Sequence, residues 1–321
     1  MTTTSTTSVR IGDSELRVHP LGLGTNVFND PAQPEGYHAV LDGFVERGGN
    51  FIDTADMYSY WVPGNSGGES EEVIGQWLAA RRNRDDVVVA TKVSGKPDLL
   101  GLSPETIARG AEESLRRLQT DHIDLYYAHY QDDETPVAES AAAFDRLVRE
   151  GKVRAVALSN FTAQAIDEWF RVAEENGLAK PVALQPRYSL VAREYEGELA
   201  AAARRHGMAV FPYQVIAGGF LTGKYRTEAD TEGRARGGAV KRYLTPEGLR
   251  VLDVLDDVAA AHGTDPASVA LAWAMADGKI TGPLAAATRP AQLDQLFAAV
   301  ELTLSADQVA QLDAASGPFR G

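Results

Sequence analysis

The feature that most constrains the fold is the regular alternation of short apolar runs with longer amphipathic segments along the chain. Each apolar run has the length and composition of a buried strand, and each longer segment has helical periodicity. Strands that alternate with helices pair in parallel, and eight such units in 321 residues favour a closed barrel. The predicted strands are residues 21–25, 50–53, 87–92, 123–129, 153–159, 181–185, 208–213 and 280–285.

Helices are predicted between and after these strands, and several carry their own start and stop signals. Ser103 and Pro104 open one helix as an N-cap followed by a proline at the first helical position. Gly151 and Gly177 end two others. The predicted helices are residues 35–47, 69–81, 104–118, 137–150, 162–176, 196–206, 246–262, 265–276, 290–300 and a last one from 305. Residues 218–244 are predicted as a long functional loop.

Two architectures are compatible with this alternation. An open, doubly wound sheet usually shows G-x-G-x-x-G after its first strand, and residues 22–27 (GLGTNV) fail that pattern at the last position. We therefore predict an α/β fold, a (β/α)8 TIM barrel with an N-terminal β-hairpin over residues 9–18 and extra C-terminal helices. No change in composition suggests a linker, so residues 1–321 are predicted to form a single barrel domain, with 1–8 as a frayed polar tail.

The composition excludes several classes of function. A formal net charge of −14 argues against a nucleic-acid partner, because phosphate recognition needs clustered basic residues. No apolar run is long enough to span a membrane. The absence of cysteine excludes disulfides and thiolate metal sites, and we expect a cytoplasmic protein. The six histidines lack ligand-like spacing, so no metal site is predicted. The sequence does not predict the oligomeric state.

Four polar side chains end or closely follow successive predicted strands: Asp53, Tyr58, Lys92 and His129. The carboxyl ends of barrel strands share one face, so these groups should converge there. Each alone has an ordinary structural explanation, such as a turn cap or a solvated charge. Together they form an acid–base set in which Lys92 would lower the pKa of the Tyr58 phenol and Asp53 would orient Lys92. His129 would share the proton or bind a substrate oxygen.

Several motifs in this order resemble the aldo-keto reductase family over nearly the whole chain. The resemblance is carried by residues 53–58 (DTADMY), 91–92 (TK), His129, 159–161 (SNF), Gln185, Tyr213 and 218–224 (GGFLTGK). It implies the eight-stranded barrel and the reversible reduction of a carbonyl compound by NADPH, with NADH less favoured. It assigns Tyr58 as proton donor, Lys92 and Asp53 as its tuning pair, and His129 as the substrate-orienting group.

The resemblance also implies a set of cofactor contacts. Ser159, Asn160 and Gln185 match the groups that bind the nicotinamide amide, and Tyr213 matches the aromatic side chain that stacks on its ring. The remaining candidates are Thr25 and Asn26 near the barrel mouth, Ile216, Gly218 and Lys224 at the pyrophosphate, and Thr288, Arg289 and Gln292 at the adenosine end. Arg234 or Arg236 is a candidate clamp from the long loop.

Two departures from the family pattern bear on these contacts. Residues 214–216 (QVI) replace Ser-Pro-Leu after Tyr213, and Gln295 and Leu296 replace the Glu–Asn pair near the adenine. Arg289 could still bind a 2′-phosphate, since arginine is its usual recogniser. If Ser159 and Asn160 were instead only a helix cap, the amide contacts would be lost.

Substrate contacts are predicted in the loops at the barrel mouth. The predicted substrate residues are Phe28, Trp61 and Tyr130, with Tyr60 and Arg187 as further candidates. An apolar or aromatic aldehyde or ketone, or a sugar-derived carbonyl compound, would fit, and the sequence does not choose between them. The alternative function is a nucleotide-binding redox sensor or scaffold protein of the same fold that turns over little.

Overall fold

The computed structural model describes residues 8–234 and 236–320, so the tail predicted over residues 1–8 lies, except for Ser8, outside the described residues. The strands are β1 (Val9–Arg10), β2 (Arg17–Val18), β3 (Gly22–Gly24), β4 (Phe51–Asp53), β5 (Val88–Val93), β6 (Gly95–Lys96), β7 (Leu99–Leu100), β8 (Ile123–Ala128), β9 (Val153–Ser159), β10 (Ala183–Gln185), β11 (Ala209–Val210) and β12 (Leu284–Ala285). The α-helices are α1 (Glu35–Glu46), α2 (Glu69–Arg81), α3 (Pro104–Leu118), α4 (Val137–Arg149), α5 (Ala163–Asn176), α6 (Glu198–Arg205), α7 (Gly237–Val240), α8 (Pro246–His262), α9 (Pro266–Met275), α10 (Leu293–Glu301) and α11 (Ala306–Ala315).

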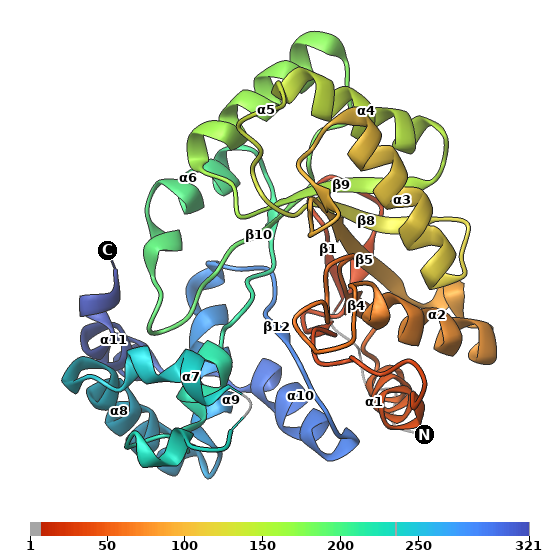
Figure 1. Ribbon diagram of the computed structural model, residues 1–321. Coiled ribbons are helices and arrows are strands. Elements are labelled where there is room, and N and C mark those ends of the chain that lie inside the picture. Colours follow the sequence, from red (N-terminus) through yellow and green to blue (C-terminus); the bar gives the residue numbers. More distant parts are fainter. Residues whose placement is uncertain (1–7, 235, 321) are drawn as a thin grey trace.

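Eight strands form one parallel sheet in the order β11-β10-β9-β8-β5-β4-β3-β12. Backbone hydrogen bonds then join its two edges, from the Thr281 amide to the Val210 carbonyl at 2.8 Å and from the Leu284 amide to the Pro212 carbonyl at 3.0 Å. The sheet therefore closes on itself, and the predicted (β/α)8 barrel is confirmed. Helices α1 to α6 follow its outside from the lower right over the top to the left of Figure 1, α7, α8, α9 and α11 gather at the lower left, and α10 lies at the lower centre.

The strands read as continuous apolar runs because both of their faces are buried. All six residues of β5 and all six of β8 are buried. A smaller core fills the barrel interior, where Phe51 packs edge-to-face on Phe211 at 4.8 Å between ring centroids. The larger core lies between the sheet and the surrounding helices and includes Trp77 and Trp169.

The hairpin β1–β2 pairs antiparallel and closes one end of the barrel. Its side chains Ile11, Leu16 and Val18 are buried in the same cluster as the interior residues of the strands. The hairpin therefore plugs the end opposite to the carboxyl ends of the strands, which leaves those carboxyl ends as the open face.

The helix signals in the sequence act as expected. The Ser103 hydroxyl accepts a hydrogen bond from the Thr106 amide, and Thr162 caps α5 in the same way. Gly177 ends α5 in the left-handed conformation, which glycine adopts without a steric cost. Several details differ from the prediction. β6 and β7 form a hairpin that was not predicted, α10 begins at Leu293 after a 3-10 turn, and the long loop contains α7 and short 3-10 turns. The strands predicted over residues 208–213 and 280–285 are shorter, as β11 and β12.

Candidate active site

A cavity of about 290 Å³ lies at the carboxyl ends of the barrel strands. Asp53 ends β4, Lys92 lies near the end of β5, and His129 directly follows β8. Because these strands pair in parallel register, with Asp53 opposite Ala90 and Lys92 opposite Tyr127, their ends reach the same level. Tyr58 comes from the loop between β4 and α2, which brings its phenol back over the strand ends. Asp53, Tyr58 and His129 line this cavity.

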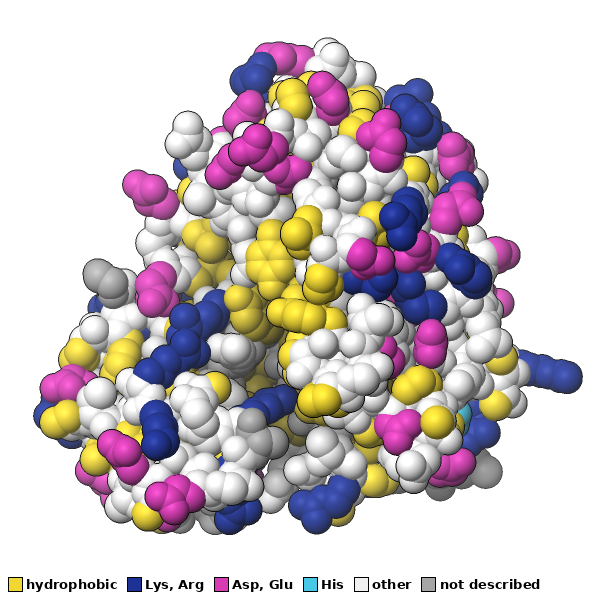
Figure 2. Space-filling view, viewed as in Figure 1, with side chains coloured by type: hydrophobic (Ala, Val, Ile, Leu, Met, Phe, Trp, Pro, Cys, Tyr) yellow, Lys and Arg dark blue, Asp and Glu magenta, His cyan; other side chains and the backbone are white. Residues whose placement is uncertain are grey.

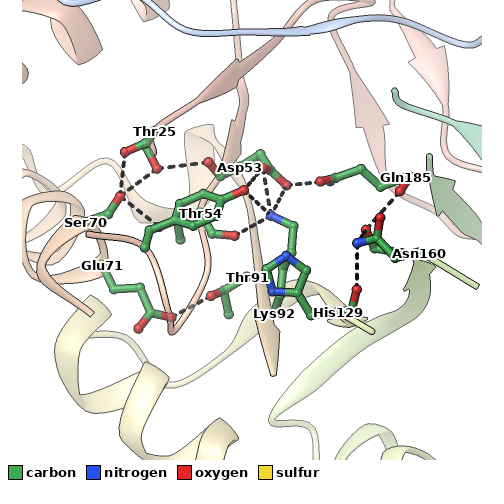
Figure 3. Close-up of polar contacts among 12 residues, drawn as sticks. Thr25, Asp53, Thr54, Ser70, Glu71, Thr91, Lys92, His129, Asn160 and Gln185 are labelled. Carbon is green, nitrogen blue, oxygen red and sulfur yellow. Dashed lines mark hydrogen bonds and ion pairs between the residues drawn. The ribbon is translucent and has the colours of Figure 1, made fainter. Parts of the chain in front are cut away.

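The Lys92 ammonium is the centre of the polar network (Figure 3). It contacts both oxygens of Asp53 at 2.9 and 2.8 Å, the Thr54 carbonyl at 2.7 Å and the Tyr58 hydroxyl at 3.1 Å. An ammonium has three protons, and these three neighbours accept all of them. Since the Tyr58 oxygen accepts from Lys92, its own proton can point to the long contact with Asp53 at 3.4 Å or into the cavity.

The protonation states follow from burial. Burial raises the pKa of the Tyr58 phenol well above its usual range, and the Asp53 carboxylate adds to the rise. This is the opposite of the lowering expected from Lys92. Burial lowers the pKa of Lys92, against the opposing effect of Asp53. Burial also lowers the pKa of His129 well below its usual range, and the charge of Lys92 lowers it further. The set therefore contains a protonated phenol beside a neutral imidazole.

A second set of side chains lines the cavity next to the first. Tyr213 donates to the Asn160 side-chain oxygen at 2.8 Å, and the Asn160 amide nitrogen donates to the His129 carbonyl at 2.9 Å. Gln185 donates to Asp53 at 2.8 Å, and the Ser159 hydroxyl donates to the Gln185 carbonyl at 2.9 Å. The predicted amide-binding residues are thus connected to the predicted acid–base residues through direct hydrogen bonds.

The loops around this cavity contain unusual backbone conformations. Among the described residues other than glycine, eight have a positive φ, and five of them are Ser59, Ser94, Asn160, Gln214 and Ala217. All five follow the carboxyl ends of barrel strands, and two of them, Asn160 and Gln214, line the cavity. Such conformations persist only where surrounding contacts enforce them, and they concentrate at functional sites.

Several predicted residues line the cavity and others do not. Asn26, Trp61, Tyr130, Ile216, Gly218 and Arg236 line it. Arg234, in contrast, lines a separate cavity with Lys224. Thr288 and Arg289 donate backbone hydrogen bonds to the Gln292 side chain, in the turn after the cavity-lining residues Leu284, Ala285 and Ala286.

Three other predicted residues do not line the cavity themselves. Phe28 is fully buried and packs on Tyr37 at 4.8 Å between ring centroids, so it is a core residue and does not line the cavity. Thr25 is buried and donates to the Asp53 carbonyl at 2.9 Å. Arg187 donates to the Tyr243 hydroxyl at 2.8 Å.

The sequence interpretation missed the residues of α2 that hydrogen-bond to the strand ends carrying this network. Ser70, in the first turn of α2, bonds to Thr25 and Thr54, and Glu71 accepts from Thr91 at 2.5 Å (Figure 3). Met57 and Gln214 were also missed as cavity-lining residues. Acidic and hydroxyl residues in a first helical turn are common surface features, so their type alone gave no signal of burial.

Within residues 8–234 and 236–320, no group of His, Asp and Glu side chains has an arrangement that could hold a metal ion. In the same part of the chain, none of the helices combines the length and apolar character needed to cross a membrane.

Comparison with known proteins agrees with this architecture. The chain is 32% identical over 334 residues to "Protein tas" of Escherichia coli (strain K12), covering 95% of this chain and 96% of that protein. It is 34% identical over 313 residues to "Uncharacterized oxidoreductase YrpG" of Bacillus subtilis (strain 168), covering 94% of each. It is 30% identical over 317 residues to "Norsolorinic acid reductase B" of Aspergillus parasiticus, covering 92% of this chain and 80% of that protein.

The family model described as "Aldo/keto reductase family" matches residues 20–316, which include every strand of the barrel and the whole cavity lining. Relatives of this family with oxidoreductase and reductase names match over nearly the full length. The chain is therefore an oxidoreductase that belongs to the aldo/keto reductase family.

Proposed function

We propose that the protein reduces an aldehyde or ketone to an alcohol with NADPH, and that Tyr58 donates the proton. The observation that carries the proposal is the contact of the Lys92 ammonium with Asp53, the Thr54 carbonyl and the Tyr58 hydroxyl. With the Lys92 protons all accepted, the phenol proton is the one that can reach a carbonyl oxygen in the cavity.

The side chains of the cavity fit a nicotinamide nucleotide. Tyr213 offers an aromatic face, and Asn160, Ser159 and Gln185 offer amide and hydroxyl groups beside it. The anionic part of a nucleotide needs cations that are not already neutralised. Of the predicted cationic contacts, Lys224, Arg234, Arg236 and Arg289 have no carboxylate within 4.0 Å among the ion pairs of the described residues. Arg236 lies in the cavity itself, which favours it over Arg234 as the clamp.

The proposed chemistry divides between cofactor and protein. Bound NADPH would supply the hydride that adds to the carbonyl carbon. Tyr58 would form the new O–H bond by giving its proton to the carbonyl oxygen, and Lys92 would stabilise the phenolate that remains. His129 lines the cavity as a neutral imidazole and makes no side-chain hydrogen bond with the described residues, so it can bind the same carbonyl oxygen. Solvent would then reprotonate Tyr58.

The assay is NADPH oxidation with a panel of aldehydes and ketones, with the alcohol product identified by chromatography and NADH run in parallel. We expect carbonyl-dependent oxidation with one alcohol formed per NADPH consumed, and a preference for NADPH supported by Arg289. Tight NADPH binding without turnover of any carbonyl compound would instead favour the redox-sensing or scaffold protein.

A further inference from the structure

Trp61 and Tyr130, together with Met57, form one side of the cavity. We call these three residues the aromatic wall. Trp61 is 50% exposed and Tyr130 is 42% exposed, and they are two of the four large hydrophobic side chains exposed on the described surface. The other two are Tyr60, which precedes Trp61 in the same loop, and Leu100, which lies in the hairpin β6–β7. Figure 2 shows hydrophobic side chains gathered around the hollow at the centre of this face. Exposed apolar surface of this kind marks a binding site.

The aromatic wall is held in place from two loops. Tyr130 stacks on His129 with ring centroids 4.5 Å apart and an angle of 16° between the rings. Its hydroxyl contacts the Met57 sulfur at 3.9 Å, which joins the two loops across the cavity. The Trp61 ring meets the Tyr58 ring edge-to-face at 6.1 Å. The indole is therefore close to the phenol, so a compound that reacts at Tyr58 must extend past it.

The chemistry of the aromatic wall selects among carbonyl compounds. A sugar needs several hydrogen-bonding groups, and the aromatic wall offers a thioether, an indole and a phenol already directed at the thioether. Aromatic faces favour flat rings, in offset-stacked or edge-to-face arrangements. Arg236 and the side-chain amides of Asn160 and Gln185 lie among the predicted cofactor contacts, with Tyr213, and Asp53 is already bonded to Lys92.

We infer that the substrate is a planar aromatic aldehyde or ketone whose ring system lies against Trp61 and Tyr130 while its carbonyl oxygen meets Tyr58. This inference rests on the proposed function and adds the substrate class to it. The aromatic wall contributes through contact with the ring system and leaves the hydride and proton steps to the groups already described.

The test compares two aldehydes with the same reacting group, 2-naphthaldehyde and cyclohexanecarbaldehyde, in the wild-type protein and in Trp61→Leu and Tyr130→Leu. Each aromatic ring should contribute a factor of about 2 to 12 in kcat/KM for 2-naphthaldehyde. The same variants should lower kcat/KM for cyclohexanecarbaldehyde by a smaller factor, because leucine keeps the apolar contact, so the ratio of the two kcat/KM values should fall. Leu100→Ala is the matched control, since Leu100 is exposed on the same face but does not line the cavity.

A second measurement keeps the inference separate from the proposed function. Calorimetric titration with 2-naphthylmethanol and cyclohexylmethanol measures the aromatic wall without turnover, and the wild-type protein should prefer the naphthyl compound by a factor that falls in Trp61→Leu. Equal losses for the aromatic and the alicyclic compound in the variants, or no loss for either, would overturn the inference. In that case carbonyl reduction by Tyr58 would still stand, and the exposed patch would be assigned to a protein partner.

Discussion

At the scale of single residues, burial sets the protonation of Tyr58 and His129, the two groups that we propose to act on the carbonyl oxygen. Removal from water favours the neutral form of both groups, so the phenol keeps its proton and the imidazole stays uncharged. A proton donor is active when it is protonated. A raised pKa of Tyr58 therefore extends the range of reduction toward high pH, and a lowered pKa of His129 extends it toward low pH.

We predict that kcat/KM for carbonyl reduction is constant from about pH 6.5 to about pH 9, because neither group titrates between the ordinary values of His and Tyr. The decline at higher pH belongs to the coupled pair of Tyr58 and Lys92. The measurement is a pH–rate profile at saturating NADPH. A steady fall in activity between pH 6.5 and pH 8 would contradict this assignment.

The types of these residues were predictable, whereas their environments were not. Parallel strands share one edge, so Asp53, Lys92 and His129 could be placed together from their positions after apolar runs. The direction of the Tyr58 pKa shift depends on how completely the folded loops exclude water from the phenol. That burial results from the packing of distant segments, so the residues next to Tyr58 in the sequence do not predict it. Phe28 was wrongly expected at the cavity for the same reason, because an aromatic residue after a strand can face the core or the mouth.

At the scale of elements, the first turn of α2 holds the ends of three strands. Ser70 bonds to Thr25 after β3 and to Thr54 after β4, and Thr54 in turn accepts from Lys92. Glu71 accepts from Thr91 in β5 and pairs with Arg117 of α3 at 2.7 Å. Helices α2 and α3 approach closely at Gly75, where a Cβ atom would lie 2.1 Å from the Arg117 carbonyl oxygen. This contact lets Arg117 reach Glu71.

We predict that Glu71→Gln lowers the free energy of unfolding by up to about 3 kcal/mol, because the buried Arg117 then keeps only its longer ion pair with Glu113 at 3.4 Å. It should also lower kcat, since Thr91 precedes Lys92 in β5. Urea unfolding and steady-state assays measure the two effects. Glu72→Gln is the control: its side chain is exposed on the same helix, and its change should stay below about 0.5 kcal/mol. Equal effects of both substitutions would refute the anchoring role of Glu71.

The boundaries of several helices could be predicted from capping residues and glycines, but the contacts that α2 makes with other elements could not. Ser103-Pro104, Thr162 and Gly177 act locally, within one turn of the residue that signals them. The bonds of Ser70 and Glu71 reach residues up to 46 positions away, and their partners are fixed only when the barrel closes. The hairpin β6–β7 was missed because its strands have two residues each, too few for a period to be read.

The whole molecule separates stability from chemistry along the barrel axis. The hairpin β1–β2 fills the end opposite to the cavity with Ile11, Leu16 and Val18. In barrels of this kind the carboxyl face carries function and the opposite face contributes stability. The alternation of strands and helices predicted this architecture because the same local pattern, a short apolar strand and an amphipathic helix, recurs along the chain for each of the eight strands.

We predict that Ile11→Ala lowers the free energy of unfolding by about 2 to 4 kcal/mol, the usual effect of removing a large aliphatic side chain from a core. Its kcat/KM at 25 °C should stay within about twofold of wild type, because the site lies at the other end of the barrel. Val9→Ala, at a partly buried position of the same hairpin, should lower the free energy of unfolding by less than Ile11→Ala does. Lost activity with unchanged stability would place the hairpin in the functional site.

The most direct test of the central claim is a single-turnover measurement of NADPH oxidation in Tyr58→Phe, with NADPH affinity determined by fluorescence titration. Removing a general acid typically lowers the rate by about 10²- to 10⁴-fold, and we predict a loss in this range with NADPH affinity within about twofold of wild type. A rate within about tenfold of wild type would contradict Tyr58 as the proton donor.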